Sequence, residues 1–401
     1  MPISKILRIF GFYKVYLLAS FLKPKQLFIE LKATPEHITC PKCGGTDFIF
    51  YGKKKRIFRD LSIGNRELYV IYHRQRIKCS CCGVLSEHLS FADDYSHYTK
   101  RFERYVFDLC RIMTVADVAN HLQLSWDVVK EIDKKYLTKK YRKPNYKNVR
   151  FIAVDEISIG KHHNYLTIVL NLETGRIVYV GDDRKQATLD AFFLQLGKVR
   201  CRRIKAIAMD CWDPYIASAT HYLGCHKIVF DKFHLVSNYG KVIDKIRISE
   251  FDKADLDDRN IIKGTKYLLL ANEENLKKEH QRNKLKAVLE LNENINLSYI
   301  LKDELKLIWS YDDQQQMEQA LNNWIEKAFA SKLKPLIKFA NMLHRYRYGI
   351  LNYCQYPIST GKLEGTNNKI KVLKRKAYGF CDMDYFKLKL FDLHNNNSNT
   401  G

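Results

Sequence analysis

Residues 150–183, RFIAVDEISIGKHHNYLTIVLNLETGRIVYVGDD, decide how the second half of the chain is expected to fold. The stretch contains three runs rich in Val, Ile, Leu and Tyr, and such runs predict β-strands. The second and third runs are joined by a short turn at Thr174 and Gly175, which predicts a hairpin. Residues 187–197 follow with apolar side chains at helical spacing. The pattern predicts an antiparallel three-stranded meander and then a helix.

Two further strands continue this pattern. Residues 204–210 (IKAIAMD) and 226–231 (HKIVFD) predict strands, with a helix between them over residues 214–224. A meander followed by alternating helices and strands is the order of the ribonuclease H-like fold, in which the first and fourth strands lie side by side. The predicted class is therefore α/β, and Asp155 and Asp210, at the ends of those two strands, are expected to converge.

Converging carboxylates are typical of a site that binds two metal ions and cuts phosphodiesters, and Mg²⁺ prefers such oxygen ligands. A single aspartate at a strand end is more often a solvated turn former, so the matched positions of Asp155 and Asp210 carry the catalytic interpretation. Asp231, after the fifth strand, is a rival ligand, and with His234 it is a candidate for supporting the site. Glu156 is expected to point to the opposite face of the sheet.

A third carboxylate stands at the head of a strongly basic segment, ISTGKLEGTNNKIKVLKRKAYGF (358–380). Between Gly361 and Lys376 the one acid is Glu364. A lone acid would repel the phosphates that such a segment attracts, unless a divalent cation lies between them. If the segment is helical, Glu364 supplies a third metal ligand and polar residues of the same helix hold DNA. The predicted DNA contacts here are Asn368, Lys371, Lys374 and Arg375.

Two cysteine pairs near the N-terminus predict a zinc site. The turns CPKCG and CSCCG contain Cys40, Cys43, Cys79 and Cys82, and each C-x-x-C-G turn can offer two thiolates to one tetrahedral zinc. Cys81 is out of register and is treated as a bystander. The intervening sequence favours a zinc ribbon with a long hairpin, whereas the alternative is four buried free thiols. The basic surface expected to face DNA is Lys53, Lys54, Lys55 and Arg56.

Residues 114–137, TVADVANHLQLSWDVVKEIDKKYL, have the spacing of a helix-turn-helix. Thr114 and Ser125 are suitable N-caps for two short helices. The second helix would enter a major groove, with Trp126 and Lys130 among its exposed residues. An ordinary helical hairpin is the alternative, and the neighbouring zinc ribbon and the charge of the chain favour the DNA-binding interpretation.

The composition favours a polyanionic partner. The 401 residues carry a formal net charge of +24, and the sequence pI is about 9.4. Such an excess makes nucleic acid a more plausible partner than a membrane, and no apolar run approaches the about 20 residues of a membrane span. Eleven cysteines in this setting indicate a reducing compartment and metal binding. A basic ribosome-associated protein also fits these totals.

The predicted domain order has seven parts. They are an N-terminal helical segment (1–39), a zinc-ribbon DNA-binding domain (40–95), a helix-turn-helix region with a basic linker (96–148), the first part of a ribonuclease H-like core (149–240), a helical insertion (241–350), a catalytic helix that completes the core (351–392) and a disordered tail (393–401).

The chain resembles the transposases of the ISL3 group of bacterial insertion sequences, which carry a DDE triad. The resemblance rests on CPKCGG…CSCCG, the helix-turn-helix, FIAVDEISIGKHHNYLTIVLNLETGRIVYV, AIAMDCWDPY, VFDKFHLV and KLEGTNNKIKVLKRKAYGF. It implies that Asp155, Asp210 and Glu364 are the triad, with two Mg²⁺ or Mn²⁺ ions, and that the helices from about 240 to 345 are an insertion. It also implies hydrolysis at the element ends, which frees a 3′ hydroxyl that attacks target DNA.

The implied partners are the terminal inverted repeats and the target DNA, and two ends must be brought together by a homodimer or a higher oligomer. The implied location is the bacterial cytoplasm, at the nucleoid. A catalytically silent DNA-binding protein of transposase descent is the main alternative. Another ribonuclease H-like nuclease, such as a junction resolvase, would not need separate sequence-reading modules. A zinc-ribbon transcription regulator would leave the second half of the chain without a role.

Overall fold

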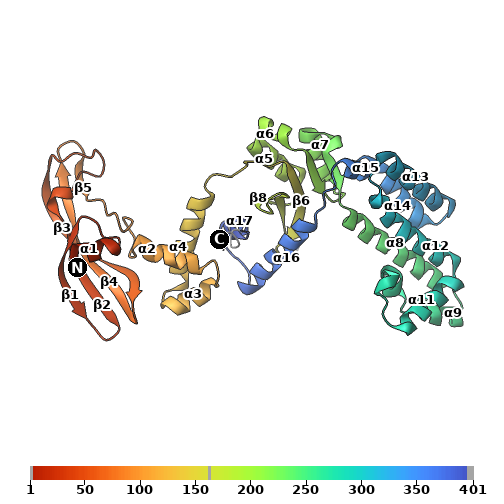
Figure 1. Cartoon of the computed structure of the whole chain (residues 1–401), viewed down its shortest axis with the longest axis horizontal. Coiled ribbons are helices and arrows are strands. Elements are labelled where there is room, and N and C mark those ends of the chain that lie inside the picture. The colour runs from red at the N-terminus through yellow and green to blue at the C-terminus, as the bar shows by residue number, and fades with distance from the viewer. Residues whose placement is uncertain (1–2, 161–163, 395–401) are drawn as a thin grey trace. The chain divides into compact units, whose positions relative to one another are not determined.

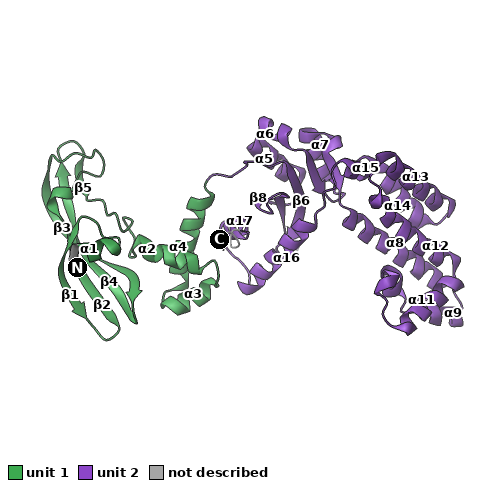
Figure 2. Ribbon diagram, in the orientation of Figure 1, with its two compact units in different colours: residues 1–142 green, residues 143–401 purple. Residues whose placement is uncertain are grey.

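The computed structural model describes residues 3–160 and 164–394. The chain forms two compact units, residues 1–142 and 143–401, coloured separately in Figure 2. Most of the predicted disordered tail, residues 395–401, lies outside the described residues. Within the described part of the chain, no helix combines the length and the apolar character needed to cross a membrane.

The N-terminal segment is mostly β-structure, so the prediction of a helical segment over residues 1–39 is wrong. Helix α1 covers only Ile3–Ile9, and strands β1 (Val15–Leu22) and β2 (Gln26–Ala33) follow it. Gly11, at φ 76°, ends the helix in a conformation that suits glycine. The apolar strand β1 then pairs antiparallel with β2, so its backbone groups find hydrogen-bond partners in the sheet. The apolar character of so short a run does not by itself distinguish a strand from a helix.

The sheet of the first unit is built on a long hairpin, as the spacing between the cysteine pairs predicts. Strands β3 (Phe48–Ile63) and β4 (Arg66–Cys79) are antiparallel, and the short strand β5 (Gly83–Ser86) pairs with β4. The strand order is β1-β2-β4-β3, with β2 parallel to β4. The cysteine turns therefore lie at the open end of the hairpin, away from the connection between its strands.

Three helices complete the first unit: α2 (Lys100–Leu109), α3 (Val115–Leu122) and α4 (Trp126–Tyr141). Both predicted caps are present. Thr114 and Asp117 form a capping box at the start of α3, and the Ser125 side chain accepts a hydrogen bond from the backbone of Val128 at the start of α4. Buried apolar residues of all three helices form one cluster, so this region is a packed helix-turn-helix domain.

A fully buried carboxylate joins the sheet of this unit to its helices. Asp60 of β3 accepts hydrogen bonds from Arg101 Nε (2.7 Å) and Nη2 (2.5 Å), from Thr99 Oγ1 (2.6 Å) and from the backbone of Leu61 (2.8 Å). Thr99 is also the N-cap of α2, because its side chain accepts from the backbone of Phe102. The zinc-ribbon sheet and the first helix of the next domain are therefore held together by a charge-assisted network.

The second unit has a five-stranded mixed sheet in the order β10-β9-β6-β7-β8, and the elements are labelled in Figure 1. Its strands are β6 (Phe151–Ser158), β7 (Tyr165–Asn171), β8 (Ile177–Asp182), β9 (Ala206–Met209) and β10 (Ile228–Phe230). The meander β6-β7-β8 is antiparallel, whereas β9 is parallel to β6 and β10 is parallel to β9. The first and fourth strands are neighbours, as predicted, and the fold is ribonuclease H-like.

Helices cover both faces of this sheet. Ile152 and Val154 of β6 pack in one apolar cluster with residues of α5 (Gln186–Leu196) and α7 (Asp213–Leu223). Ala153 of β6 and Ala208 of β9 pack in another with residues of α16 (Gly361–Lys376) and α17 (Met383–Asp392). The C-terminal basic segment is therefore a helix, as predicted, and it closes one face of the sheet.

A helical region separates β10 from α16 in the sequence. It begins at Lys232, earlier than the predicted start at residue 241, because β10 ends at Phe230 and the chain turns directly into α8. The helices are α8 (Lys232–Lys253), α9 (Leu256–Ile262), α10 (Lys266–Leu270), α11 (Glu279–Leu291), α12 (Glu293–Leu307), α13 (Gln314–Ala330), α14 (Lys334–Arg345) and α15 (Arg347–Gln355). This region also has two 3₁₀ turns, η3 (Glu273–Asn275) and η4 (Ile308–Ser310). The short elements elsewhere in the chain are helix α6 (Lys198–Arg203) and the 3₁₀ turns η1 (Pro35–His37) and η2 (Cys225–Lys227).

Candidate active site and nucleic-acid interface

Three aspartates lie on or directly after three adjacent parallel strands: Asp155 is within β6, Asp210 follows β9 and Asp231 follows β10. Ala153 pairs with Ala208, so Asp155 in β6 and Asp210 after β9 lie at the same level along their strands. The backbone of Asp231, directly after β10, donates to the carbonyl of Met209 at 2.9 Å. Because side chains alternate along a strand, Asp155 and Asp210 share the face of Ala153 and Ala208, which α16 covers.

Helix α16 packs on this face and reaches the first aspartate. Leu363, Thr366, Asn367 and Ile370 form its buried side. Asn367 Nδ2 donates a hydrogen bond of 2.8 Å to Asp155 Oδ2, while the backbone of Glu156 donates to Asp155 Oδ1 at 2.8 Å. Two donors thus orient the Asp155 carboxylate, and each oxygen keeps a further lone pair for another ligand.

Glu364 stands one helical turn before Asn367 on α16 and is exposed. Its carboxylate has no hydrogen bond or ion pair with any described residue. Asn368, Lys371 and Arg375 are exposed on the same helix, in the grouping that the sequence predicts. The helix therefore carries, one turn before the residue that contacts Asp155, a carboxylate that has no partner among the described residues.

The rival aspartate, Asp231, is already engaged. It is buried, and Thr360 Oγ1, just before α16, donates to its Oδ2. His234 Nε2 lies 4.0 Å from the same oxygen. Asp231 Oδ1 is buried without a hydrogen-bond partner among the described residues. These contacts tie the end of β10 to the start of α16, so Asp231 and His234 lie where they can support the site.

The aspartates lie in an environment that disfavours their charged forms. Burial, with the nearby Glu156 charge as the next cause, raises the pKa of Asp155 to about 6 and that of Asp210 to about 7. Asp210 Oδ1 is buried without a partner among the described residues. A divalent cation with oxygen ligands would satisfy that oxygen and offset the repulsion between the carboxylates. Among the described residues, Asp155, Asp210 and Glu364 do not come close enough together to form a three-ligand cluster.

Glu156 lies on the opposite face of the sheet from Asp155, as strand alternation predicts. Arg184 Nη1 lies 3.5 Å from its Oε1. The sequence interpretation missed Arg184, and it also missed Asn367 and Thr360 as residues of the site. No local pattern marks Arg184, but the three residues TNN after Glu364 offered polar side chains one turn further along the helix.

The four predicted zinc ligands lie together in the first unit. The sulfur atoms of Cys40, Cys43, Cys79 and Cys82 are all within 4.8 Å of one another. Hydrogen bonds from the backbone of Cys43 and Lys42 lower the pKa of Cys40 to about 6, which favours the thiolate that a metal requires. Cys81 is exposed and lies outside this group. Four sulfur ligands at this spacing suit structural zinc.

Comparison with known proteins decides the family. Residues 152–390 match a family model described as a transposase, residues 87–137 match the helix-turn-helix domain of transposase family ISL3, and residues 36–82 match the zinc finger of the IS204/IS1001/IS1096/IS1165 transposases. The chain belongs to the ISL3 family of transposases. It is therefore an enzyme of DNA transposition with DNA-binding domains before its catalytic core.

Two relatives show how far the similarity extends. The transposase for insertion sequence element IS1001 of Bordetella parapertussis is 35% identical over 370 residues, which is 91% of each chain. The transposase for insertion sequence element IS1557 of Mycobacterium tuberculosis is 26% identical over 366 residues, covering 85% of this chain and 82% of that relative. Both alignments span the DNA-binding and catalytic regions of this transposase.

The predicted basic surface of the zinc ribbon lies on β3. Lys53, Lys54 and Lys55 are exposed there. Arg56 is half-buried, and its guanidinium donates to the backbone carbonyls of Asp94 (3.1 Å) and Ser96 (2.8 Å). Arg56 therefore holds the loop after β5 as well as adding positive charge. Lys374 of α16 is similar, since its ammonium donates to the carbonyl of Ile159 at 2.9 Å.

The second helix of the helix-turn-helix presents Trp126 to solvent, with 49% of the residue exposed. The ammonium of Lys130 lies 5.7 Å from the centre of the Trp126 ring. Both residues are on the first turns of α4, the part of a recognition helix that contacts base edges. Trp126 is exposed as predicted, but Lys130 is half-buried, with 17% of its side chain exposed.

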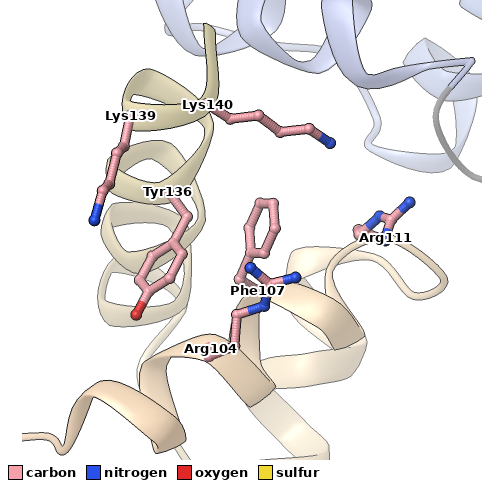
Figure 3. Close-up of a pocket in the computed structure, with 6 residues that line it drawn as sticks. All are labelled: Arg104, Phe107, Arg111, Tyr136, Lys139 and Lys140. Atoms are coloured by element: carbon pink, nitrogen blue, oxygen red, sulfur yellow. The ribbon is translucent and has the colours of Figure 1, made fainter. Parts of the chain in front are cut away.

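A basic groove lies between α2 and α4, and the sequence interpretation did not identify it (Figure 3). Its volume is about 340 Å³, and its lining consists of Arg104, Phe107, Arg111, Tyr136, Lys139 and Lys140. The two rings are stacked with centroids 5.4 Å apart, and the Arg104 guanidinium lies 5.4 Å from the centre of Phe107. Basic side chains around two aromatic rings suit the binding of a nucleic acid. The alternation of basic and aromatic residues in the sequence could have indicated this groove.

Proposed function

We propose that this transposase binds the terminal inverted repeats of its own element and catalyses metal-dependent strand cleavage and strand transfer. Asp155, Asp210 and Glu364 are the proposed triad. The observation that carries the proposal is the common level of Asp155 and Asp210 on adjacent parallel strands, beneath the helix that carries Glu364. Two carboxylates at one sheet edge and a third on a covering helix are the donor set for two ions.

The proposed cofactor is Mg²⁺ or Mn²⁺, held by oxygen atoms of Asp155, Asp210 and Glu364. When bound, such ions polarise the scissile phosphate and lower the pKa of the attacking water. The protein orients Asp155 through Asn367 and ties α16 to the sheet through Thr360 and Asp231. Asp231 and His234 have a supporting role, because the carboxylate of Asp231 is already shared with Thr360.

The proposed DNA interface has two kinds of contact, one to base edges and one to phosphates. Trp126 and Lys130 of α4 read base edges, while basic side chains of the zinc ribbon and of α16 contact phosphates. The residues assigned to DNA are Lys53, Lys54, Lys55, Arg56, Trp126, Lys130, Asn368, Lys371, Lys374 and Arg375. Each phosphate neutralised should contribute about −0.9 to the slope of log K against log salt concentration, so end binding should weaken steeply with salt.

Zinc has a structural role in this proposal. Four thiolates leave no open coordination position, so the ion would hold the hairpin and not take part in strand cleavage. Synapsis of the two element ends requires at least two copies of the catalytic unit, so a homodimer or a higher oligomer is the proposed active form.

The testing experiment is cleavage of a labelled duplex that carries the inverted repeats flanking the gene, with Mg²⁺ or Mn²⁺ against a chelator. The expected result is metal-dependent nicks at the repeat ends. A scrambled-repeat duplex of equal length is the control for sequence specificity. Tight, salt-sensitive binding without a nick under any metal would contradict the catalytic proposal and indicate a DNA-binding protein that has lost its activity.

A further inference from the structure

Arg184 occupies an unusual position beside the acidic edge of the sheet. It follows β8, and its guanidinium carbon lies 4.3 Å from the centre of the Tyr165 ring and 4.5 Å from that of Trp212. Trp212 Nε1 donates to the backbone carbonyl of Arg184 at 3.0 Å, which holds the loop in place. Trp212 comes two residues after Asp210, so this arrangement is built onto the same strand end as the second aspartate.

The Arg184 guanidinium keeps donors for another ligand, because among the described residues its N–H groups have one hydrogen-bond partner, Glu156. The N–H groups of a guanidinium form a planar fork that matches the spacing of phosphate oxygens. Arg184 keeps 29% of its side chain exposed. The guanidinium is therefore held in place before any ligand arrives, and little side-chain entropy remains to be lost on binding.

Neutralisation of Glu156 is the simpler role for Arg184, and the geometry argues against it as the main one. The Arg184–Glu156 contact is 3.5 Å long. Other arginines of the chain pair more closely, at 2.5 Å for Arg101 with Asp60 and 2.6 Å for Arg150 with Glu173. Charge-assisted hydrogen bonds are usually about 2.7–2.9 Å. Arg184 is thus poorly satisfied by Glu156 and retains donors for an anion.

We propose that Arg184 binds a non-bridging oxygen of a DNA phosphate at the catalytic edge, either the scissile phosphate or its immediate neighbour. The inference rests on the proposed function and identifies how that site holds its substrate. Asp155, Asp210 and Asp231 lie at this edge, and Glu156 is next to Asp155 on the other face, so a phosphodiester approaching the edge needs a cation that the protein itself supplies. Arg184 provides this charge, and Tyr165 and Trp212 are positioning residues that fix its plane.

The test replaces single phosphates of the end duplex with neutral methylphosphonates around the cleavage site and measures single-turnover cleavage. For the wild-type protein, one position should lower the rate by about 10–100-fold, as expected for one hydrogen bond to a charged group. Arg184→Ala should lower the rate on natural DNA by a similar factor and show no further loss at that position. Equal additional losses at every position in Arg184→Ala would overturn the proposal.

Two variants separate the phosphate contact from a general loss of charge or fold. Arg184→Lys keeps the charge but loses the planar fork, so it should recover only part of the rate and part of the methylphosphonate sensitivity. Arg150→Ala removes an exposed arginine from the start of the same sheet and should retain both wild-type rate and sensitivity. A thermal unfolding midpoint equal to that of the wild type would confirm that Arg184→Ala is folded.

A binding measurement keeps the test independent of cleavage. Affinity for a pre-cleaved end duplex in Ca²⁺ is measured over a range of salt concentrations, with wild type and Arg184→Ala compared. One lost phosphate contact should make the slope of log K against log salt shallower by about 0.9. An unchanged slope would overturn the Arg184 assignment even if cleavage is observed. Absence of cleavage by the wild type, with the expected change in slope, would contradict only the catalytic proposal.

Discussion

The side-chain amide of Asn367 in α16 donates a hydrogen bond of 2.8 Å to Asp155 in β6, across 212 residues of sequence. This contact joins the first strand of the catalytic core to the last helix that covers it. It lies one turn from Glu364, so it also sets where that carboxylate stands relative to the sheet edge. The helical region from α8 to α15 is therefore accommodated without separating the two parts of the proposed site.

Replacing Asn367 should weaken metal binding. Asn367→Ala removes the donor that orients Asp155, and a lost partner of a metal ligand typically costs 10–100-fold in metal affinity or activity, about the range expected here. The measurement is the Mn²⁺ concentration that gives half-maximal cleavage. Asn341→Ala, an exposed asparagine on α14, is the matched control and should leave this concentration unchanged. A wild-type Mn²⁺ requirement in Asn367→Ala would show that the contact does not orient Asp155.

Glu364→Gln should abolish strand cleavage and retain binding to the element ends. The change keeps the shape of the side chain and removes the charge that a divalent cation needs. Because the carboxylate of Glu364 has no partner among the described residues, folding should be unaffected. Cleavage and mobility-shift assays on the same preparation separate the two effects. Glu326→Gln, at an exposed position of α13, serves as control, and cleavage by Glu364→Gln at the wild-type rate would remove Glu364 from the triad.

Cys40→Ser should release zinc and weaken DNA binding. A hydroxyl replaces one of the four sulfur atoms that lie within 4.8 Å of one another, and structural zinc sites need all four ligands. Metal content of the purified protein is the direct measurement, with duplex affinity as the second. Cys81→Ser is the control, because Cys81 is next to Cys82 in sequence but outside the cluster. Equal zinc content in the two variants would refute the ligand assignment.

Asp60→Ala should destabilise the first unit strongly. The change leaves the Arg101 guanidinium without its buried partner, and breaking such a pair costs roughly 3–5 kcal/mol. Urea unfolding of the full chain, followed by hydrogen–deuterium exchange of peptides from β3 and α2, is the measurement. Asp108→Ala, which removes an exposed ion pair with Arg104 on α2, should unfold near the wild-type midpoint. A similar midpoint for both variants would show that the buried network is not important for stability.

The sequence was informative wherever local pattern decides structure. Strand periodicity placed Asp155 and Asp210 at matched positions on the first and fourth strands, although the first strand continues past Asp155 to Ser158, and cap residues placed the starts of α3 and α4. It was misleading at the N-terminus, where a short apolar run fits a helix or a strand equally well. Only the pairing of β1 with β2 resolves that choice, because it supplies the backbone partners of the strand.

The sequence by itself determined the order of the strands in the catalytic core, the cysteine turns and the acidic residues of that core, since these depend on neighbours a few residues apart. The tertiary structure alone decided which side chains meet across long separations. Asn367 against Asp155, Thr360 against Asp231 and Arg184 against two aromatic rings depend on how α16 and the loops pack on the sheet. Such contacts have no local periodicity, because packing and not spacing brings their partners together.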